Sequence, residues 1–361
     1  MARLIAFYLP QYHPVPENDA WWGKGFTEWT NVAKARPMFR GHYQPHVPAD
    51  LGFYDLRVPE TRAAQAEMAR EYGIEAFCYY HYWFAGKRIL ERPFNEVLRT
   101  GNPDFPFCLC WANQTWTGIW HGCPDRILAE QTYPGLDDHR AHFEALLPAF
   151  TDRRYVTVDG KPLFLIFNWD EIPHVREVTD FWRTMATKAG LQGLHLVAVL
   201  HHKDAWNPGD HGFDACVRTY LRQRKEGYIS WRQPVRKVLR HLERKSGRPV
   251  VFPYSKAMMD VFPDALSGGS EYLCLIPNWD NTPRCGTAGV VQDGSTPELF
   301  RVQVKKSLDL TEGVPPEHRI IFVKSWNEWA EGNHVEPDLK FGTGYLKVLH
   351  EELQTIHRAI P

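Results

Sequence analysis

Two carboxylates stand three residues apart near the end of the chain, Glu328 and Glu331, shortly after the apolar run Ile320–Val323. Barrel enzymes hold their catalytic groups at the carboxyl ends of the strands, so a strand that leads into this segment can direct both side chains into one pocket. The indoles of Trp326 and Trp329 lower the local dielectric, which raises the pKa of a nearby carboxyl group. We predict that Glu328 and Glu331 are the catalytic acid/base residues.

A plainer interpretation of the same two residues is that they begin a solvated helix. Acidic side chains in a first turn favour a helix through its dipole and need no catalytic role. The two neighbouring tryptophans argue against this interpretation, because a solvated turn has little use for indoles. We therefore favour the catalytic interpretation and expect both carboxylates to face a cavity.

Aromatic residues make up 14% of the chain, with 14 Trp and 15 Tyr, and many stand beside polar residues after the predicted strands. Each one alone is as consistent with core packing as with binding. Together they suit a carbohydrate, because pyranose C–H faces stack on aromatic rings while hydroxyls need fixed polar partners. The candidate substrate contacts are Tyr8, Tyr12, His13, Tyr80, His81, Trp83, Trp111, Asn113, Trp116, Asn168, Asp170, His201, Trp279, Trp326, Asn327 and Glu336.

The elements that would position these residues follow a repeated strand-helix pattern. Short apolar runs predict strands over 4–9, 76–80, 107–111, 163–167, 194–200, 215–218, 272–276 and 320–323. Helical spacing predicts helices over 59–72, 137–150, 175–190, 233–245, 297–308 and 345–357. Alternating β and α units imply a parallel sheet, and polar residues after nearly every strand favour a closed α/β (β/α)8 TIM-type barrel.

We expect one catalytic domain over residues 1–361, because no low-complexity linker or charge block marks a boundary. Two segments between the predicted elements are long, 21–56 and 278–296. Loops of that length are usually lids or binding loops. The fold prediction is therefore a single barrel with elaborated loops at the carboxyl ends of its strands.

The segment around the two carboxylates resembles the Asn-Glu-Trp-(His)-Glu-Gly motif of the glycoside hydrolase family 99 endo-α-mannosidases. The whole chain resembles the related WbsX-type proteins, which are commonly called glycosyltransferases and are encoded among surface-polysaccharide genes. The likeness also covers IAFYLPQYH over 5–13, GFTEW over 25–29, HYWF over 81–84 and WAN over 111–113. It spans nearly the full chain.

This resemblance implies a (β/α)8 barrel and retention of configuration through a 1,2-anhydro intermediate. The first Glu of the motif, here Glu328, takes the proton from the sugar 2-OH, whose oxygen attacks the anomeric carbon. The second, here Glu331, protonates the leaving oxygen and then activates water or another acceptor. Carboxylate spacing does not predict the stereochemical outcome for routes of this kind. Ala330 stands where the mannosidases usually carry His, which puts their substrate contacts, but not the carboxylate pair, in doubt.

Metal chemistry is the main rival, because His201 and His202 follow a predicted strand with Asp204, Asp210 and His211 nearby. Zinc sites have recognisable ligand spacing, and the chain has neither HExxH nor CxxC. We expect no catalytic metal and no cofactor. A polar strand end or a substrate contact is the better interpretation of these histidines.

Nucleotide and nucleophile chemistry have weaker support. No GxGxxG or GxxxxGK[ST] follows the first strand, and Ser325 lacks a G-x-S-x-G elbow. The basic run 218–225 could hold the phosphate of a lipid- or nucleotide-linked sugar. It is more typical of a solvated helix face.

The composition restricts the binding partners and the cellular location that we expect for this protein. The net charge of -1 gives no field that would recruit nucleic acid, and the N-terminal apolar run is too short for a signal peptide or a membrane span. We expect a cytoplasmic protein without a membrane span, with buried free thiols at Cys78, Cys108, Cys110, Cys216 and Cys274. The oligomeric state stays open.

Three functions remain from the sequence. The first is a retaining glycoside hydrolase acting on a manno-configured or related polysaccharide or oligosaccharide. The second is a glycosyltransferase of O-antigen or other surface-polysaccharide biosynthesis. The expected cytoplasmic location favours this second function. The third, a non-catalytic carbohydrate-binding barrel, is disfavoured by the carboxylate pair. The absence of a nucleotide-binding glycine loop and of a DxD-type motif favours the hydrolase.

Overall fold

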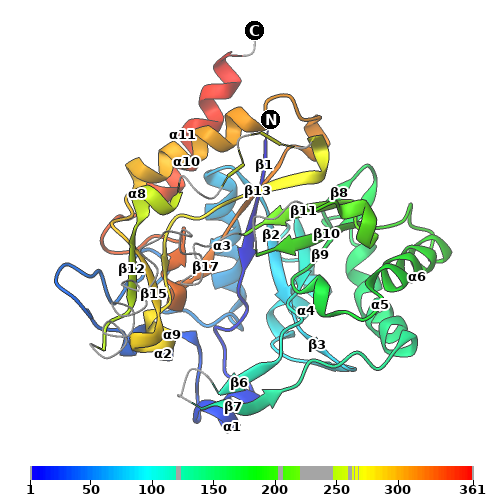
Figure 1. The fold of residues 1–361 in the computed structure, drawn as a ribbon, viewed down its shortest axis with the longest axis horizontal. Helices are drawn as coiled ribbons and strands as arrows, with labels where there is room; N and C mark the ends of the chain where they lie inside the picture. Colours follow the sequence, from blue (N-terminus) through cyan, green and yellow to red (C-terminus); the bar gives the residue numbers. More distant parts are fainter. Residues whose placement is uncertain are drawn as a thin grey trace, which may run out of the picture.

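A closed barrel of eight parallel strands forms the centre of the protein (Figure 1). The computed structural model describes residues 2–118, 123–201, 206–219, 247–258, 262–263, 265–266 and 268–359. Each strand pairs with the next, and the last pairs with the first. The strands are β1 (Arg3–Tyr8), β2 (Ile74–His81), β5 (Phe107–Trp111), β9 (Lys161–Ile166), β10 (His195–Leu200), β11 (Ala215–Arg218), β13 (Glu271–Leu275) and β16 (Ile320–Val323). The predicted (β/α)8 barrel is confirmed.

Burial on both faces explains why these strands read as continuous apolar runs in the sequence. Every residue of β5, β10 and β16 is buried, as expected where helices cover the outside of a parallel sheet and side chains fill the inside. The predicted strands match the observed ones to within one or two residues at either end. Register is continuous where the barrel closes, with Arg3 opposite Ile320 and Ala6 opposite Val323.

The helices around the barrel lie close to their predicted ranges, although two predictions need comment. The helix predicted over 233–245 falls outside the described residues. A helix over 92–100 was not predicted, although Pro93 in its first turn and Gly101 at its left-handed C-cap (φ 71°) are both sequence signals for it. The longer helices are α3 (Pro59–Glu71), α4 (Arg92–Thr100), α5 (Leu136–Phe150), α6 (Val175–Lys188), α10 (Pro297–Leu310) and α11 (Gly344–Ala359).

The two long segments predicted as loops contain short elements. The first contains α2 (Glu28–Lys34) and begins at the end of α1 (Pro16–Trp22). The second contains the strands β14 (Trp279–Asp280) and β15 (Val290–Asp293) and, between them, the helix α9 (Thr282–Cys285). The two strands form a small sheet with β12 (Val250–Pro253), which leads into α8 (Tyr254–Ala257). Helices α2 and α9 contact each other, and both contact the 3-10 turn η8 (Trp329–Glu331). The two long segments therefore meet over the predicted catalytic residues.

Short hairpins complete the described structure, and two further predictions can be compared with it. The thiols of Cys78, Cys108, Cys110, Cys216 and Cys274 are buried and free, as predicted. Within the described ranges, every helix is too short or too polar to cross a bilayer. The remaining strands are β3 (Trp83–Phe84), β4 (Lys87–Arg88), β6 (Trp116–Gly118), β7 (Cys123–Ala129), β8 (Thr157–Val158), β17 (Asn327–Glu328) and β18 (Asn333–His334).

Candidate active site

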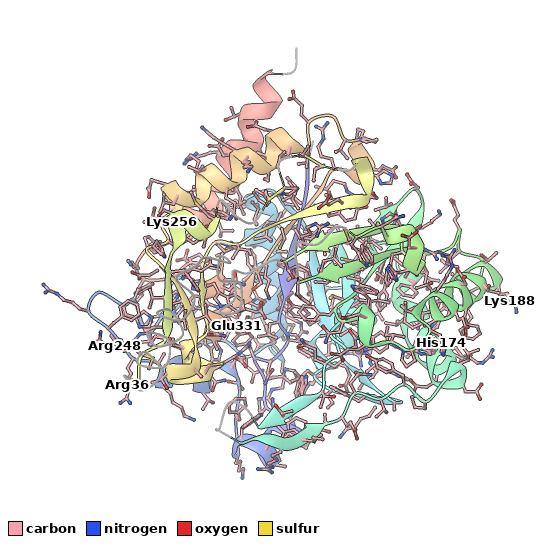
Figure 2. All side chains as sticks on the ribbon, in the orientation of Figure 1. Arg36, His174, Lys188, Arg248, Lys256 and Glu331 are labelled. Carbon is pink, nitrogen blue, oxygen red and sulfur yellow. The ribbon has the colours of Figure 1, made fainter. Side chains whose placement is uncertain are left out.

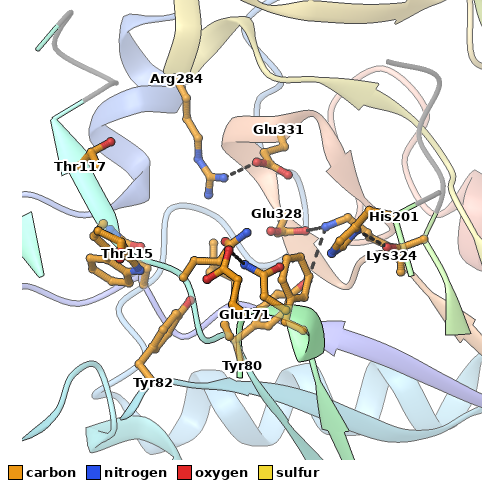
Figure 3. Close-up of a pocket in the computed structure, with 18 of the residues that line it drawn as sticks. Tyr80, Tyr82, Thr115, Thr117, Glu171, His201, Arg284, Lys324, Glu328 and Glu331 are labelled. Carbon is orange, nitrogen blue, oxygen red and sulfur yellow. Dashed lines mark hydrogen bonds and ion pairs between the residues drawn. The ribbon is translucent and has the colours of Figure 1, made fainter. Parts of the chain in front are cut away.

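A cavity of about 700 Å³ opens at the carboxyl ends of the barrel strands (Figure 3). Most of its wall is built from residues that end or follow successive strands, which is where barrel enzymes carry their active sites. Its size suits a small part of an oligosaccharide. The lining residues are Leu9, Gln11, Trp22, Tyr80, Tyr82, Ala112, Gln114, Thr115, Trp116, Thr117, Phe167, Asn168, Glu171, His201, Thr219, Trp279, Arg284, Lys324, Glu328 and Glu331.

Glu328 and Glu331 both line this cavity because the chain folds back on itself after β16. Residues 327–328 pair with residues 333–334 as the hairpin β17–β18, and η8 forms the turn between them. Gly332 ends the turn with φ 58°, where a Cβ atom would come within 3.0 Å of the Asp280 side chain. The segment is a buried hairpin and not the solvated helix of the plainer interpretation. Figure 2 shows Glu331 in the interior, whereas Lys188 and Arg36 lie at the periphery.

The amide of Asn327 anchors this hairpin to the first strand. Leu9 donates its backbone N–H to Asn327 Oδ1 at 2.7 Å, and Asn327 Nδ2 donates to the Leu9 carbonyl at 3.1 Å. Asn327 is fully buried, so both backbone groups would otherwise lack a partner. The hydroxyl of Tyr12 adds a bond to the Asn327 carbonyl. These contacts fix the backbone directly before Glu328.

Each of the two carboxylates is bonded to a different cation (Figure 3). Lys324 Nζ donates to Glu328 Oε2 at 2.9 Å, and Arg284 Nη1 donates to Glu331 Oε1 at 2.5 Å. Arg284 also donates through Nε to Glu28 Oε2 at 3.2 Å. The side chains of Glu328 and Glu331 are 7% and 15% exposed. Both carboxylates are therefore nearly buried and paired, Glu328 with Lys324 and Glu331 with Arg284, which Glu331 shares with Glu28.

The surroundings of Glu331 favour its protonated form. Burial raises the pKa of Glu331; Arg284 opposes this effect, and the negative charge of Glu328 adds to it, so that the pKa lies above its usual value. Burial would lower the pKa of Lys324, but the carboxylates of Glu328 and Glu331 outweigh burial and raise it. Lys324 is therefore a permanent ammonium group beside Glu328. The two carboxylates thus have different environments, which is the usual basis for separate acid and base roles.

Seven of the residues singled out from the sequence meet at the cavity. Five of them were predicted as substrate contacts and mix flat rings with hydrogen-bonding groups. The Lys324 ammonium lies 5.4 Å from the ring centre of Trp279, and Asn168 donates to Glu171 at 3.0 Å. Glu328 and Glu331 share the lining with Tyr80, Trp116, Asn168, His201 and Trp279.

The structure does not bring the other predicted contacts to the cavity wall. Most are buried in the core and bonded to protein groups: the Tyr8 hydroxyl donates to Gln65 at 2.6 Å, and the Trp83 indole donates to Asp138 at 3.1 Å. Successive residues of a strand point to opposite sides, so only some of the polar residues at a strand end reach the cavity. The buried residues away from the lining are Tyr8, Tyr12, His13, His81, Trp83, Trp111, Asn113, Trp326, Asn327 and Glu336.

One further predicted contact, Asp170, lies away from the cavity. Asp170 is exposed and borders a separate, shallower hollow beside the start of α6. His202 and Asp204 fall outside the described residues, as does most of the basic run 218–225.

Glu336 supports the η8 turn through buried hydrogen bonds. Its carboxylate accepts bonds from Tyr54 (2.8 Å), Gln65 (2.6 Å) and the Trp329 indole (2.6 Å). Burial raises the pKa of Glu336 to about 7. The bond to Trp329 fixes the ring at the start of η8. Glu336 therefore holds the turn that carries Glu331.

Several residues of the site were missed from the sequence. Lys324 stands four residues before Glu328, at the end of a predicted strand, and this spacing was an available signal. Arg284 and Glu28 lie in the two long segments, far from Glu331 along the chain. No local pattern links them, because only the fold brings α2 and α9 together over η8.

One protein-family model matches nearly the whole chain. The model of a family described as "Glycosyltransferase WbsX" matches residues 4–349. The chain belongs to the WbsX glycosyltransferase family. Two curated relatives, both called uncharacterized protein WxcX and both from strains of Xanthomonas campestris pv. campestris, are 37% identical over 98% of this chain. The match covers 50% of each relative, so the chain spans about half their length.

Solved structures share the fold of this WbsX family member at low sequence identity. The endo-α-mannosidase of glycoside hydrolase family 99 from Bacteroides thetaiotaomicron superposes with a TM-score of 0.55 and 13% identity, over 99% of this chain and 98% of that one. A protein described as glycoside hydrolase-like superposes with a TM-score of 0.56 and 15% identity, over 97% and 93% of the two chains. These similarities agree with the barrel described above.

Proposed function

We propose that this chain is a retaining glycoside hydrolase that acts on a manno-configured or related oligosaccharide or polysaccharide through Glu328 and Glu331. One observation carries the proposal: both carboxylates line a single cavity and are bonded to separate cations. The family is described as a glycosyltransferase family, and a solved structure with the same fold is an endo-α-mannosidase. Both names refer to enzymes that form or cleave glycosidic bonds. The aromatic and amide side chains of the wall suit the faces and hydroxyls of a sugar.

In the proposed reaction Glu328 is the base and Glu331 is the acid, as the resemblance to the family 99 mannosidases implies. Glu328 takes the proton of the sugar 2-OH, and the 2-oxygen attacks the anomeric carbon as its bond to the leaving oxygen breaks. Glu331 gives its proton to that leaving oxygen. Water then opens the 1,2-anhydro ring at the anomeric carbon, losing one proton to Glu331, while the 2-oxygen regains its proton from Glu328.

The charges of the site support these roles. The raised pKa of Glu331 suits a group that begins the cycle protonated. The ammonium of Lys324, 2.9 Å from Glu328, stabilises a carboxylate that begins the cycle ionised. Arg284 stabilises Glu331 after it has given up its proton. Two nearly buried carboxylates with opposite starting states are what acid/base cleavage requires.

The charge of the described lining favours a neutral sugar over a nucleotide-linked one. The carboxylates of Glu171 and Glu328 and the proposed acid Glu331 face the cavity together with two cations. Both cations, Arg284 and Lys324, are already bonded to carboxylates. A diphosphate would bring two further negative charges to this wall, which disfavours its binding.

The second candidate is a glycosyltransferase of surface-polysaccharide biosynthesis, and the description of the family favours it. The same pair of carboxylates would then transfer the sugar to an acceptor hydroxyl instead of to water. Hydrolysis and transfer therefore differ in donor and acceptor and not in the catalytic residues. An experiment with both classes of donor separates them.

The test incubates the protein with a library of α- and β-linked oligosaccharides and, in parallel, with nucleotide-sugars and acceptor glycans. The hydrolase proposal expects new reducing ends from an oligosaccharide and no consumption of nucleotide-sugars. Glu144→Gln, an exposed carboxylate of α5, is the matched control for Glu331→Gln. Release of a nucleotide without oligosaccharide cleavage would establish the transferase. Calorimetric binding without turnover would leave only a carbohydrate-binding barrel.

A further inference from the structure

A second cluster of titratable side chains lies outside the cavity lining, where the first long segment meets the chain after the catalytic turn. His46, His334 and Asp338 are all buried, and their nearest nitrogen and oxygen atoms lie within 4.8 Å of one another. The backbone brings them together. Ala49 donates to the Pro337 carbonyl and Leu339 donates to the Val47 carbonyl, both at 2.9 Å.

Hydrogen bonds fix the orientation of the His334 and Asp338 side chains. His334 Nδ1 donates to the Glu336 carbonyl at 2.9 Å, which leaves the lone pair on Nε2 facing His46 Nδ1, also at 2.9 Å. Asp338 Oδ1 is held by the backbone N–H groups of Lys340 (3.0 Å) and Phe341 (2.6 Å). Oriented ligands of this kind are typical of metal sites, where a second bond sets the tautomer of each histidine.

Metal ligation requires a lone pair on each imidazole. His334 presents one at Nε2, because its Nδ1 proton is donated to the Glu336 carbonyl. Asp338 supplies the negative charge. The group therefore offers two imidazoles and one carboxylate, which are ligand types that zinc accepts.

A second buried histidine pair shows how a simple hydrogen bond between imidazoles looks in this protein. His81 and His142 meet through their Nε2 atoms at 2.8 Å, and the ring of His142 stacks on Trp83 with ring centres 4.7 Å apart. Among the described residues this pair has no carboxylate in a metal-sized group, whereas the pair of His46 and His334 has one. The carboxylate of Asp338 is the feature that distinguishes a candidate metal site from a packed pair.

We infer that His46, His334 and Asp338 bind one divalent transition-metal ion, with Zn²⁺ the best match to this ligand set. Zinc accepts His nitrogen at about 2.0–2.1 Å and carboxylate oxygen at about 2.0–2.2 Å in a tetrahedron. The two nitrogens must therefore separate by a few tenths of an ångström while the carboxylate moves inward, and water takes the fourth position. The proton that His46 Nδ1 donates to His334 moves to His46 Nε2, so binding by this route releases no proton.

The site would act on structure and not on the sugar chemistry. The ring of His334 stacks on Trp329 with ring centres 3.7 Å apart and planes at 15°. Trp329 begins η8, which ends at Glu331. A metal ion at His334 would therefore fix the base of the catalytic turn and tie it to the loop that carries His46. This inference is independent of the proposed hydrolase activity, because it concerns metal binding and stability.

Calorimetric titration with ZnCl₂ tests the inference on the whole chain after chelator treatment and dialysis into metal-free buffer. We expect one equivalent to bind with a dissociation constant below about 1 μM and to raise the melting temperature by mass action. Asp338→Asn keeps the shape of the side chain and should weaken binding at least 10-fold. His46→Gln should abolish it.

The matched control is His81→Gln, which removes a histidine from the other buried pair and should leave one equivalent of zinc bound. Near-UV circular dichroism of each variant checks that it is folded, and Asp338→Asn decides the matter if His46→Gln does not fold. The Co²⁺-loaded protein should show the visible absorption of a tetrahedral site, lost in Asp338→Asn. Absence of binding to the wild type, or unchanged binding in Asp338→Asn, would overturn the inference.

Discussion

The guanidinium of Arg284 lies 2.5 Å from the carboxylate of Glu331, measured from Nη1 to Oε1. The same guanidinium also reaches Glu28, so two carboxylates share one positive charge. Arg284 lowers the pKa of Glu331, while burial, Glu328 and Glu28 raise it. Each of the two long segments thus brings a charged side chain, Glu28 or Arg284, to the proposed acid. These two charges shift the pKa of Glu331 in opposite directions.

Replacing Glu28 with Gln should move the pH profile. The variant removes a negative charge that raises the pKa of Glu331 and leaves Arg284 to Glu331 alone, so both effects lower that pKa. Glu331 acts in its protonated form, and activity falls as the pH rises through its pKa. The fall in kcat/KM at high pH should therefore occur at lower pH in Glu28→Gln than in the wild type.

The opposite shift is expected for Arg284→Gln, because the positive charge that lowers the pKa of Glu331 is lost. Profiles of kcat/KM against pH for both variants and for Glu144→Gln give the comparison. Shifts in the same direction for the two variants would contradict the assignment of Glu331 as the acid.

Removing the ammonium of Lys324 should cost stability. Lys324→Met leaves the nearly buried carboxylate of Glu328 without its cation, and breaking a buried pair in this way costs about 3–5 kcal/mol. The double variant Lys324→Met/Glu328→Gln removes the stranded charge and should recover part of that loss. Urea unfolding of both single variants and of the double variant measures the coupling. A loss in the double variant equal to the sum of the losses in the two single variants would show that the pair is not energetically coupled.

Asn327 should prove to be a support and not a substrate contact. Asn327→Ala leaves the buried N–H and C=O of Leu9 without partners and should lower the free energy of unfolding by about 2–4 kcal/mol. It should also reduce kcat, because the backbone before Glu328 loosens, while KM changes by less than about threefold. A large rise in KM with unchanged stability would return Asn327 to the substrate contacts.

Trp116 should contribute to binding through its ring. It lines the cavity, and its indole packs edge-on against Tyr82 with ring centres 5.0 Å apart. Trp116→Ala should raise KM about 10-fold with a smaller effect on kcat, since ring contacts of this kind contribute about 0.5–1.5 kcal/mol beyond the buried area. Initial rates over a range of substrate concentrations separate the two constants. An unchanged KM would remove Trp116 from the binding surface.

The barrel could be predicted from the sequence because its strands are buried on both faces. Runs such as Phe107–Trp111 and Ile320–Val323 consist of apolar or aromatic residues and are bounded by turns, and their number matches a closed barrel. The pair Glu328 and Glu331 could be found for a similar reason, since it directly follows one of these runs. Local pattern was sufficient wherever the determining contacts were local.

The rest of the site depends on contacts between distant parts of the chain. Asn327 and Glu328 are neighbours with similar polarity, yet one faces Leu9 in the core and the other faces the cavity. Composition does not distinguish them, because the direction of each side chain is set by the β17–β18 hairpin. Arg284 and His46 could not be assigned roles for the same reason. Their partners lie in other segments that only the folded barrel brings together.

The central claim is that Glu328 and Glu331 perform the chemistry, and kcat/KM of Glu331→Gln on the glycan found in the library tests it most directly. The account predicts a loss of about 10²–10⁴-fold for Glu331→Gln and a similar loss for Glu328→Gln. The melting temperature of Glu331→Gln should stay close to that of the wild type, and Glu144→Gln should keep full activity. Turnover within about threefold of the wild type in Glu331→Gln would contradict the account.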